Sequence, residues 1–349
     1  MRPVAPSSAA GRKRATLLVL GALAVASLLV ALGWGAVKIS PQQTVAIALD
    51  KAGIATGIEF TQQQSAVLWN IRLPRVLMGF IVGAALAIAG AALQVSFGNQ
   101  LADPTLLGVS GAATLGVVFA YIVGAVSLGR WTLPVFACVG ALVSAMWLMG
   151  FARRHGRSDR LTLVLAGVAL QLFLAGVVTL LVNAVRKPGM PDASYLTFGG
   201  LTGIFWRDVA LAAPLILVVA VFLWRLAPEL NMVLLDESTA SSLGVDVMRV
   251  RLFAGALAAV ATGTVVAYSG SIAFVGLVVP FILRRLLGDD HRVLLPATLL
   301  GGAALVTFGD ALARNLIAPL ELPLGVLMTV VGGPVFFWLI GRGRGVGSW

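Results

Sequence analysis

Long apolar stretches, separated by short polar segments, follow one another along nearly the whole chain. A helix needs about 20 residues to cross the hydrocarbon core of a bilayer, and most of the stretches have about this length. The pattern therefore predicts an all-α, polytopic membrane protein with about ten transmembrane helices, in a single domain of residues 1–349. The predicted spans are Ala15–Val37, Val76–Phe97, Thr105–Leu128, Trp131–Phe151, Leu161–Val185, Val209–Trp224, Leu252–Tyr268, Ile272–Leu287, Val293–Phe308 and Leu322–Ile340.

The composition agrees with this prediction, since 59% of the residues are hydrophobic and 11% are charged, against about 25% charged residues in soluble domains. In a soluble protein, the net charge of +11 would suggest a nucleic-acid partner. Basic residues in the short loops of a membrane protein fix its orientation instead, so we expect a surrounding lipid bilayer and no nucleic acid. The single cysteine, Cys138, excludes an intrachain disulfide.

The basic residues also predict the orientation. With ten spans, 16 of the 25 lysines and arginines lie on the side of the N-terminus and 9 on the other side. Because cytoplasmic loops carry the excess of positive charge, we expect both termini to be cytoplasmic. The apolar run that follows the basic residues Arg12–Arg14 is longer than the roughly 7–15 residues of a signal-peptide core, so we interpret it as an uncleaved first span.

Two segments outside the spans are long enough to fold on their own. Residues 38–75 are expected on the external side, and residues 227–250 on the cytoplasmic side. The second segment has the pattern of a short helix, with acidic and capping residues first, an apolar side, and a glycine after its end. This helix is either a docking element for a cytoplasmic partner or an ordinary linker. Its candidate coupling residues are Asp236, Glu237, Ser238, Ala240, Leu243 and Gly244.

The stretch Ser269–Arg292 holds an apolar run that is interrupted by Gly276 and Pro280. Short spans with such interruptions are typical of helices that bend around a transport pathway, although a kinked structural span is an equally good interpretation. In the second span, Gly79, Gly83 and Gly90 have the spacing of small residues that let helices approach closely. No internal repeat is evident in the sequence.

Several kinds of chemistry are missing from the sequence. It contains no GxxxxGK[ST] phosphate loop, and its only histidines are His155 and His291. We therefore predict no catalytic residues, no metal site and no bound cofactor. The spans hold almost no ionisable residues at mid-depth, whereas ion-coupled transporters usually keep such residues there. If the protein transports a solute, a separate ATPase is the expected energy source. The alternatives are an ion-coupled secondary transporter and a membrane scaffold or enzyme that transports nothing.

Four collinear stretches carry a resemblance to a known family. They are Ile71–Gly116 with its RLPR and GNQLADP motifs, Leu163–Leu170 (LVLAGVAL), Gly270–Arg292 (GSIAFVGLVVPFILRRLLGDDHR) and Gly309–Trp338 with its DALAR motif. These stretches resemble the FecCD-type permeases of bacterial importers for iron-siderophores, haem and cobalamin. The resemblance covers nearly the whole chain.

The resemblance implies a type II ABC importer permease fold in the bacterial inner membrane. It implies a second permease subunit, expected to be an identical copy, two cytoplasmic ABC ATPase subunits, and a periplasmic substrate-binding protein. Transport would proceed by alternating access. The expected substrate is an iron chelate, either haem or a ferric siderophore, with cobalamin as the alternative within the family.

The resemblance also implies roles for individual residues. Arg72, Arg75 and Arg314, which the topology places on the outer side, would contact acidic residues of the binding protein. A helical i,i+4 pair with Asp310 is the other interpretation of Arg314. The 227–250 segment would contact the ATPase. The cytoplasmic gate candidates are Asn99, Leu101, Asp159 and Arg160. The chain departs from the family pattern at Gly98, Gln100 and Phe281.

Overall fold

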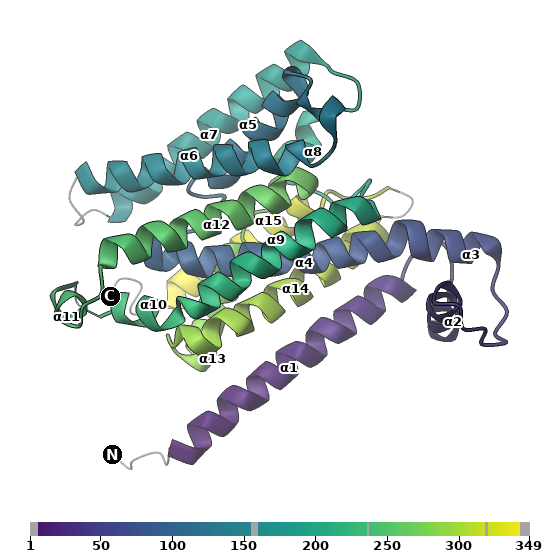
Figure 1. Cartoon of the computed structure of the whole chain (residues 1–349), viewed down its shortest axis with the longest axis horizontal. Coiled ribbons are helices and arrows are strands. Elements are labelled where there is room, and N and C mark those ends of the chain that lie inside the picture. Colours follow the sequence, from purple (N-terminus) through teal and green to yellow (C-terminus); the bar gives the residue numbers. More distant parts are fainter. Residues whose placement is uncertain (1–5, 155–159, 236, 318–319, 343–349) are drawn as a thin grey trace.

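The computed structural model describes residues 6–154, 160–235, 237–317 and 320–342, and nearly all of them are helical. The all-α prediction is therefore confirmed, and each predicted span falls on a helix (Figure 1). The longer helices are α1 (Pro6–Gly33), α4 (Leu73–Ser96), α5 (Val109–Ile122), α6 (Thr132–Arg154), α7 (Arg160–Val185), α9 (Trp206–Arg225), α12 (Val247–Ser269), α13 (Val275–Leu287), α14 (His291–Asn315) and α15 (Leu324–Arg342). The shorter helices are α2 (Pro41–Lys51), α3 (Gln62–Val67), α8 (Ala193–Phe198), α10 (Ala227–Val233) and α11 (Glu237–Ser242).

Seven helical stretches within the described ranges are long and apolar enough to cross a membrane, and α5 and α15 are shorter apolar helices. Helix α13 has 13 residues. The predicted span Thr105–Leu128 was too long at both ends. Its helix starts only after Gly108, at φ +74°, and stops before Gly124, also at φ +74°. Both glycines adopt the left-handed backbone conformation that ends or precedes a helix at little steric cost.

Helix α4 is the centre of the molecule, with α12, α13 and α14 packed around it. Its side chains are buried on nearly all sides, which is typical of an apolar helix in the core of a bundle. A Cβ atom on Gly83 would overlap the carbonyl of Gly302 in α14, and one on Gly90 would overlap the carbonyl of Gly276 in α13. The predicted close packing at these two glycines is therefore confirmed.

The structure reveals a repeated arrangement that the sequence did not show. A long helix, a turn, a short helix and a long helix follow one another twice, as α4–α5–α6 and as α12–α13–α14. Helices α4 and α12 pack together and run in opposite directions (Figure 1), with α14 packed on α4 and α6 packed on α12. Each short helix also packs on the first long helix of the other set, α13 on α4 and α5 on α12.

Both short helices begin inside the bundle. The first turn of α13 lies beside the middle of α4, because Gly276 contacts the carbonyl of Leu86 as well as Gly90. The turn before α5 reaches the same depth, since Asp103 and Pro104 also lie against Gly276. Two turns, one from each end of the bundle, therefore meet near its centre.

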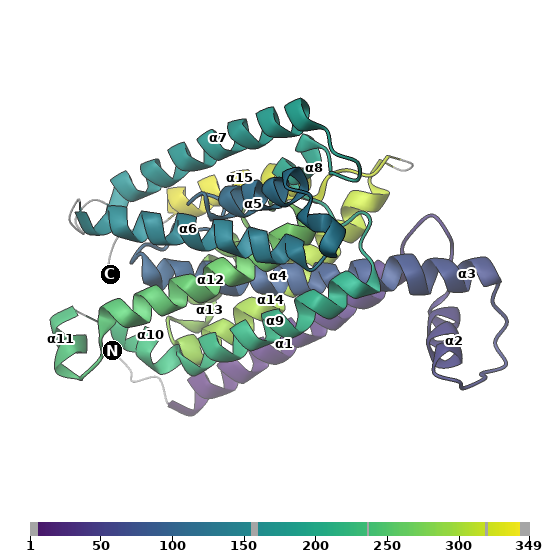
Figure 2. The ribbon, with the colours of Figure 1, turned by 45° about the horizontal axis from the view of Figure 1, so that its top comes forward.

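The expected external segment contains α2 and α3, which project from one end of the bundle (Figures 1 and 2). Its glutamines have a structural role. Gln43 completes a capping box with Ser40 at the start of α2, and Gln64 completes one with Thr61 at the start of α3. Helices α10 and α11 lie at the opposite end of the bundle, where α1 begins and α15 ends (Figure 2). This arrangement agrees with an even number of crossings.

Candidate functional site

The end of the bundle from which α2 and α3 project holds a cluster of buried charges. The Arg75 guanidinium, at the start of α4, faces Asp310 near the end of α14, with NH2 at 2.9 Å from Oδ1 and Nε at 3.1 Å from Oδ2. Its NH1 donates to Oε2 of Glu321 at 2.9 Å. The Asp310 side chain is 3% exposed, whereas that of Glu321 is 46% exposed. Arg75 therefore holds one buried acid and one accessible acid.

The other two predicted docking arginines bind the end of α1. Arg314 pairs with Asp310 four residues earlier (Nε to Oδ2, 3.1 Å), and its NH2 donates to the carbonyl of Ala31 at 3.1 Å. Arg72 donates to the carbonyl of Leu32 at 2.9 Å and to that of Val37. The last carbonyls of a helix have no partner within the helix, and a basic side chain stabilises them. The i,i+4 interpretation of Arg314 is thus borne out, and both arginines also cap α1.

A cavity of about 840 Å³ adjoins the cluster, between the α1–α2 connection and the ends of α4 and α14. Lys38, Arg72, Arg75 and Arg314 contribute positive charge to its lining, and Glu321 contributes negative charge. With an excess of cationic groups, the cavity is suited to an acidic side chain of a partner. The sequence carries no signal for Glu321, because nothing in the order of residues links it to Arg75, 246 positions away.

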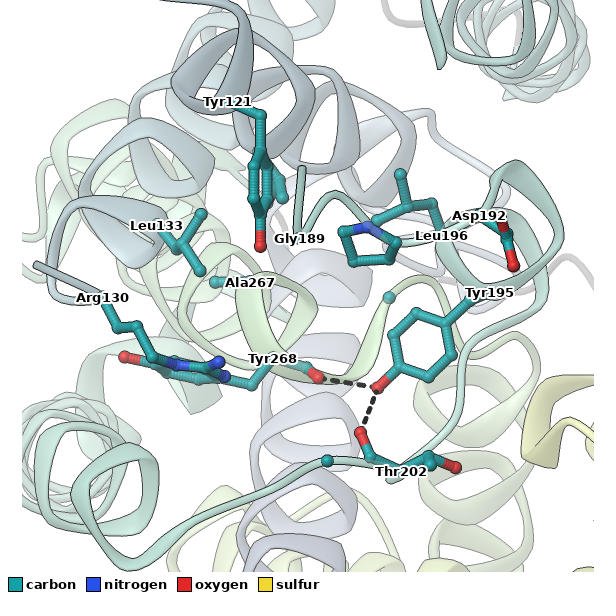
Figure 3. Close-up of a pocket in the computed structure, with 14 residues that line it drawn as sticks. Tyr121, Arg130, Leu133, Gly189, Asp192, Tyr195, Leu196, Thr202, Ala267 and Tyr268 are labelled. Atoms are coloured by element: carbon teal, nitrogen blue, oxygen red, sulfur yellow. Dashed lines mark hydrogen bonds between the residues drawn. The ribbon is translucent and has the colours of Figure 1, made fainter. Parts of the chain in front are cut away.

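A second cavity, of about 280 Å³, lies between α5, α6, α8 and the end of α12 (Figure 3). The three tyrosines of the chain, Tyr121, Tyr195 and Tyr268, all line it. The Tyr195 hydroxyl lies 2.9 Å, 3.0 Å and 3.3 Å from the carbonyl oxygens of Gly200, Tyr268 and Thr202. Burial raises the pKa of Tyr195, so its hydroxyl stays protonated and donates. The sequence carried no signal for this cavity, since the tyrosines belong to three distant segments.

An ion pair closes one side of the tyrosine-lined cavity. Arg130 binds Asp208 through two contacts, Nε to Oδ1 at 2.8 Å and NH2 to Oδ2 at 3.0 Å. Asp208 is fully buried at the start of α9, where it also accepts the backbone N–H of Phe205 at 3.0 Å. Thr202 connects this cavity with the charged cluster, because its hydroxyl donates to Oε2 of Glu321 at 3.3 Å.

The structure brings two of the four gate candidates together. The side-chain oxygen of Asn99 accepts the backbone N–H of Leu101 at 2.9 Å, which stabilises the turn after α4. In the same turn, Asp103 accepts the backbone N–H of Thr105 at 2.8 Å and lies within reach of the N–H of Leu277 in α13. Asp159 lies outside the described residues. Arg160 is the first residue of α7, and its side chain is not among the described ones.

The predicted coupling segment forms α10 and α11. Gly244 follows α11 at φ +83°, as expected for the residue after a helix end. Ala240 is buried and Leu243, directly after α11, is 59% exposed, so α11 has an apolar contact with the bundle and is followed by an apolar residue at the surface. Asp236 lies outside the described residues. Glu237 and Ser238 open α11, and only their backbone is described.

A polar network joins α10 to the start of α14. The Asn231 amide donates to Asp290 Oδ1 at 2.9 Å, and its oxygen accepts the backbone N–H of the buried His291 at 2.8 Å. Partial burial raises the pKa of Asp290, but the hydrogen bonds from Asn231 and the Arg292 backbone, together with the charges of Lys13 and Arg292, outweigh this effect and lower the pKa overall. The pattern of the sequence gave no reason to single out Asn231, since asparagine is common in linking segments.

Comparison with known proteins agrees with this architecture. The family model described as the FecCD transport family matches residues 23–342. The vitamin B12 import system permease protein BtuC of Escherichia coli O9:H4 is 40% identical over 293 residues, which cover 83% of this chain and 88% of that protein. The BtuC protein of Shigella boydii serotype 18 is equally similar over the same shares.

Solved structures show the same fold. A metal-chelate type ABC transporter in an inward-facing conformation has a TM-score of 0.76 and 28% identity, covering 94% of this chain and 99% of that one. The PsaBC structure from Streptococcus pneumoniae in complex with Fab has a TM-score of 0.56 and 17% identity, over 77% of this chain and 91% of that one. The second likeness concerns the fold alone.

Proposed function

Because the chain belongs to the FecCD transport family, we propose that it imports a large metal chelate across the bacterial inner membrane by alternating access, with both termini in the cytoplasm. The chain is a transport permease of an ABC importer, and importers of this kind work with ATPase subunits and a substrate-binding protein. The proposal concerns the substrate, the subunit arrangement and the residues that contact each partner.

Among chelates, the proposed substrate is a cobalamin-type corrinoid. The observation that carries this choice is the 40% identity to vitamin B12 permeases over most of the chain. An iron chelate, either haem or a ferric siderophore, was the first expectation from the sequence and remains the second candidate. The described spans place few charged groups at mid-depth, which suits a pathway that binds its substrate weakly and leaves affinity to the binding protein.

An uptake assay distinguishes the two candidates. The permease, with its ATPase and binding protein, is expressed in cells that lack their own corrinoid, haem and siderophore importers. Labelled cyanocobalamin, haem and a ferric siderophore are then offered separately. We expect cyanocobalamin to accumulate, and accumulation of an iron compound instead would refute the corrinoid proposal. The control is an ATPase variant that cannot hydrolyse ATP. Uptake that persists in this control and collapses with a proton uncoupler would identify a secondary transporter.

We place the ATPase contact at α10 and α11. These helices lie at the end of the bundle opposite α2 and α3 (Figure 2), and Leu243 offers an exposed apolar side chain there. The turn that contains Asn99 and Leu101 is the proposed gate. Motion of α10 would reach the start of α14 through the hydrogen bonds of Asn231.

A second copy of this chain is the proposed partner within the membrane. Helix α7 exposes large apolar side chains along its length, among them Leu172, Phe173 and Leu180. Lipid or a second permease would cover this face equally well. We propose the dimer because the chain belongs to the FecCD transport family. Native mass spectrometry of the purified importer checks it, and one permease copy per complex would contradict it.

A further inference from the structure

The three outer arginines differ in how far a partner can reach them. The side chains of Arg75 and Arg314 are 10% and 9% exposed, and Arg72 as a residue is 4% exposed. Arg72 and Arg314 use their donors on carbonyls of the α1 end and, for Arg314, on Asp310. A partner that took these donors would leave the buried end of α1 without its capping contacts.

Arg75 is different because one of its two acids is accessible. Asp310 is buried and shared by Arg75 and Arg314, so removing it would leave two buried positive charges uncompensated. Glu321 is nearly half exposed and contacts Arg75 through a single nitrogen, NH1. It belongs to the segment that links α14 to α15. Because the Glu321 carboxylate is close to water, solvent screens its attraction to Arg75, and this pair contributes less stability than the buried pair with Asp310. Another carboxylate could therefore replace Glu321 at small cost.

We infer that Glu321 is a displaceable carboxylate, which occupies on Arg75 the position that an acidic side chain of the binding protein takes on docking. This inference rests on the proposed function. The cavity beside the cluster provides the access route, since Arg75 and Glu321 line the same wall. Its other cationic residues attract the incoming acid. Docking then exchanges one carboxylate for another and leaves Asp310 in place.

The exchange changes what holds the start of α15. Besides Arg75, Glu321 accepts a hydrogen bond from Thr202, and α15 begins three residues later, at Leu324. While Glu321 binds Arg75, it holds the approach to α15 against α4 and against the rim of the tyrosine-lined cavity. When the binding protein docks and displaces Glu321, the approach to α15 loses its contact with Arg75.

The experiment measures the affinity of the binding protein encoded with this permease for the importer in nanodiscs, at low and at physiological salt. In Glu321→Gln the competing charge is gone, and we expect docking to tighten about two- to fivefold, the range that a half-exposed ion pair allows. Glu59→Gln is the matched control. It removes an exposed glutamate from the segment between α2 and α3, at the same end of the bundle. The Glu59 carboxylate forms no ion pair among the described residues, so this variant should leave the affinity unchanged.

A second variant distinguishes a failure of the proposed displacement of Glu321 from a failure of the proposed docking at Arg75. Arg75→Lys retains a positive charge for Asp310 but loses the planar fork that binds two acids at once. It should weaken docking, and combining it with Glu321→Gln should abolish the gain. If Arg75→Lys weakens docking while Glu321→Gln leaves it unchanged or weaker, the displacement is wrong and the docking site stands. If neither variant alters the affinity, docking at Arg75 is itself wrong.

Discussion

Asp310 is the residue on which the charged cluster of Arg75 and Arg314 depends, and Asp310→Asn tests this dependence. In the native protein its carboxylate binds Arg75 and Arg314, and all three side chains are at most 10% exposed. The amide keeps the size of the side chain and removes its charge. Arg75 still has Glu321, whereas Arg314 keeps the carbonyl of Ala31 and, among the described residues, no carboxylate partner.

The expected loss of stability follows from the charge that Arg314 would then bury without compensation. Removing one partner of a buried ion pair costs about 3–5 kcal/mol, because the remaining charge stays buried without compensation. A chain of 349 residues should shift by about 1–2 °C per kcal/mol, so the melting temperature should fall by on the order of 5 °C. Intrinsic tryptophan fluorescence of the detergent-purified protein, followed on heating, measures this shift.

Two further variants complete the test. Asp246→Asn removes a carboxylate from an exposed pair with Arg249, whose side chain is 87% exposed, while asparagine keeps the helix cap. It should shift the melting temperature very little. Asp310→Asn combined with Arg314→Gln removes the uncompensated charge as well and should recover part of the loss. An Asp310→Asn protein that melts with the wild type would show that the cluster contributes nothing to stability.

Three other predictions concern the core and the opposite end of the bundle. Gly90→Ala should destabilise the protein by about 1–3 kcal/mol, because its Cβ would overlap the carbonyl of Gly276, whereas Gly176→Ala, in open space on α7, should melt no lower than the wild type. Asn231→Ala should lower substrate uptake per ATP hydrolysed in the reconstituted importer, and an unchanged ratio would remove Asn231 from the coupling path. The pKa of Asp290 is lowered by folding, so its contribution to stability is present above the pKa of the unfolded chain and is lost as the pH falls through the folded value. Asp290→Asn should therefore lose less stability than the wild type on acidification below about pH 4, as measured by melting across a pH series.

The helices were predictable from the sequence because the membrane demands long apolar stretches, and these are local features. Contacts between distant segments were not. Arg75 meets Asp310 across 235 positions, and no periodicity links them, whereas the Arg314–Asp310 pair lies within one helix and was foreseen as an alternative.

The two turns that meet near the centre escaped prediction for a related reason. Hydropathy cannot distinguish an apolar residue in a short helix from one in a turn that folds back into the bundle. The span Thr105–Leu128 was therefore assigned too many helical residues. The repeat was equally hidden, since the two halves share an order of elements and a way of packing without evident sequence similarity.

Helix α14 connects the two polar networks that the sequence did not reveal. Its first residue, His291, binds Asn231 of α10, and its last turns carry Asp310 and Arg314. Between these points it packs tightly on α4, through Gly302 against Gly83. A helix of 25 residues spans about 37 Å. Pro296 removes one backbone hydrogen bond near its start, and the glycine contact holds the helix against α4 beyond this point. A displacement at α10 should therefore be transmitted along α14 to the pair formed by Arg75 and Asp310, so that the proposed ATPase contact and the proposed docking site act on the same helix.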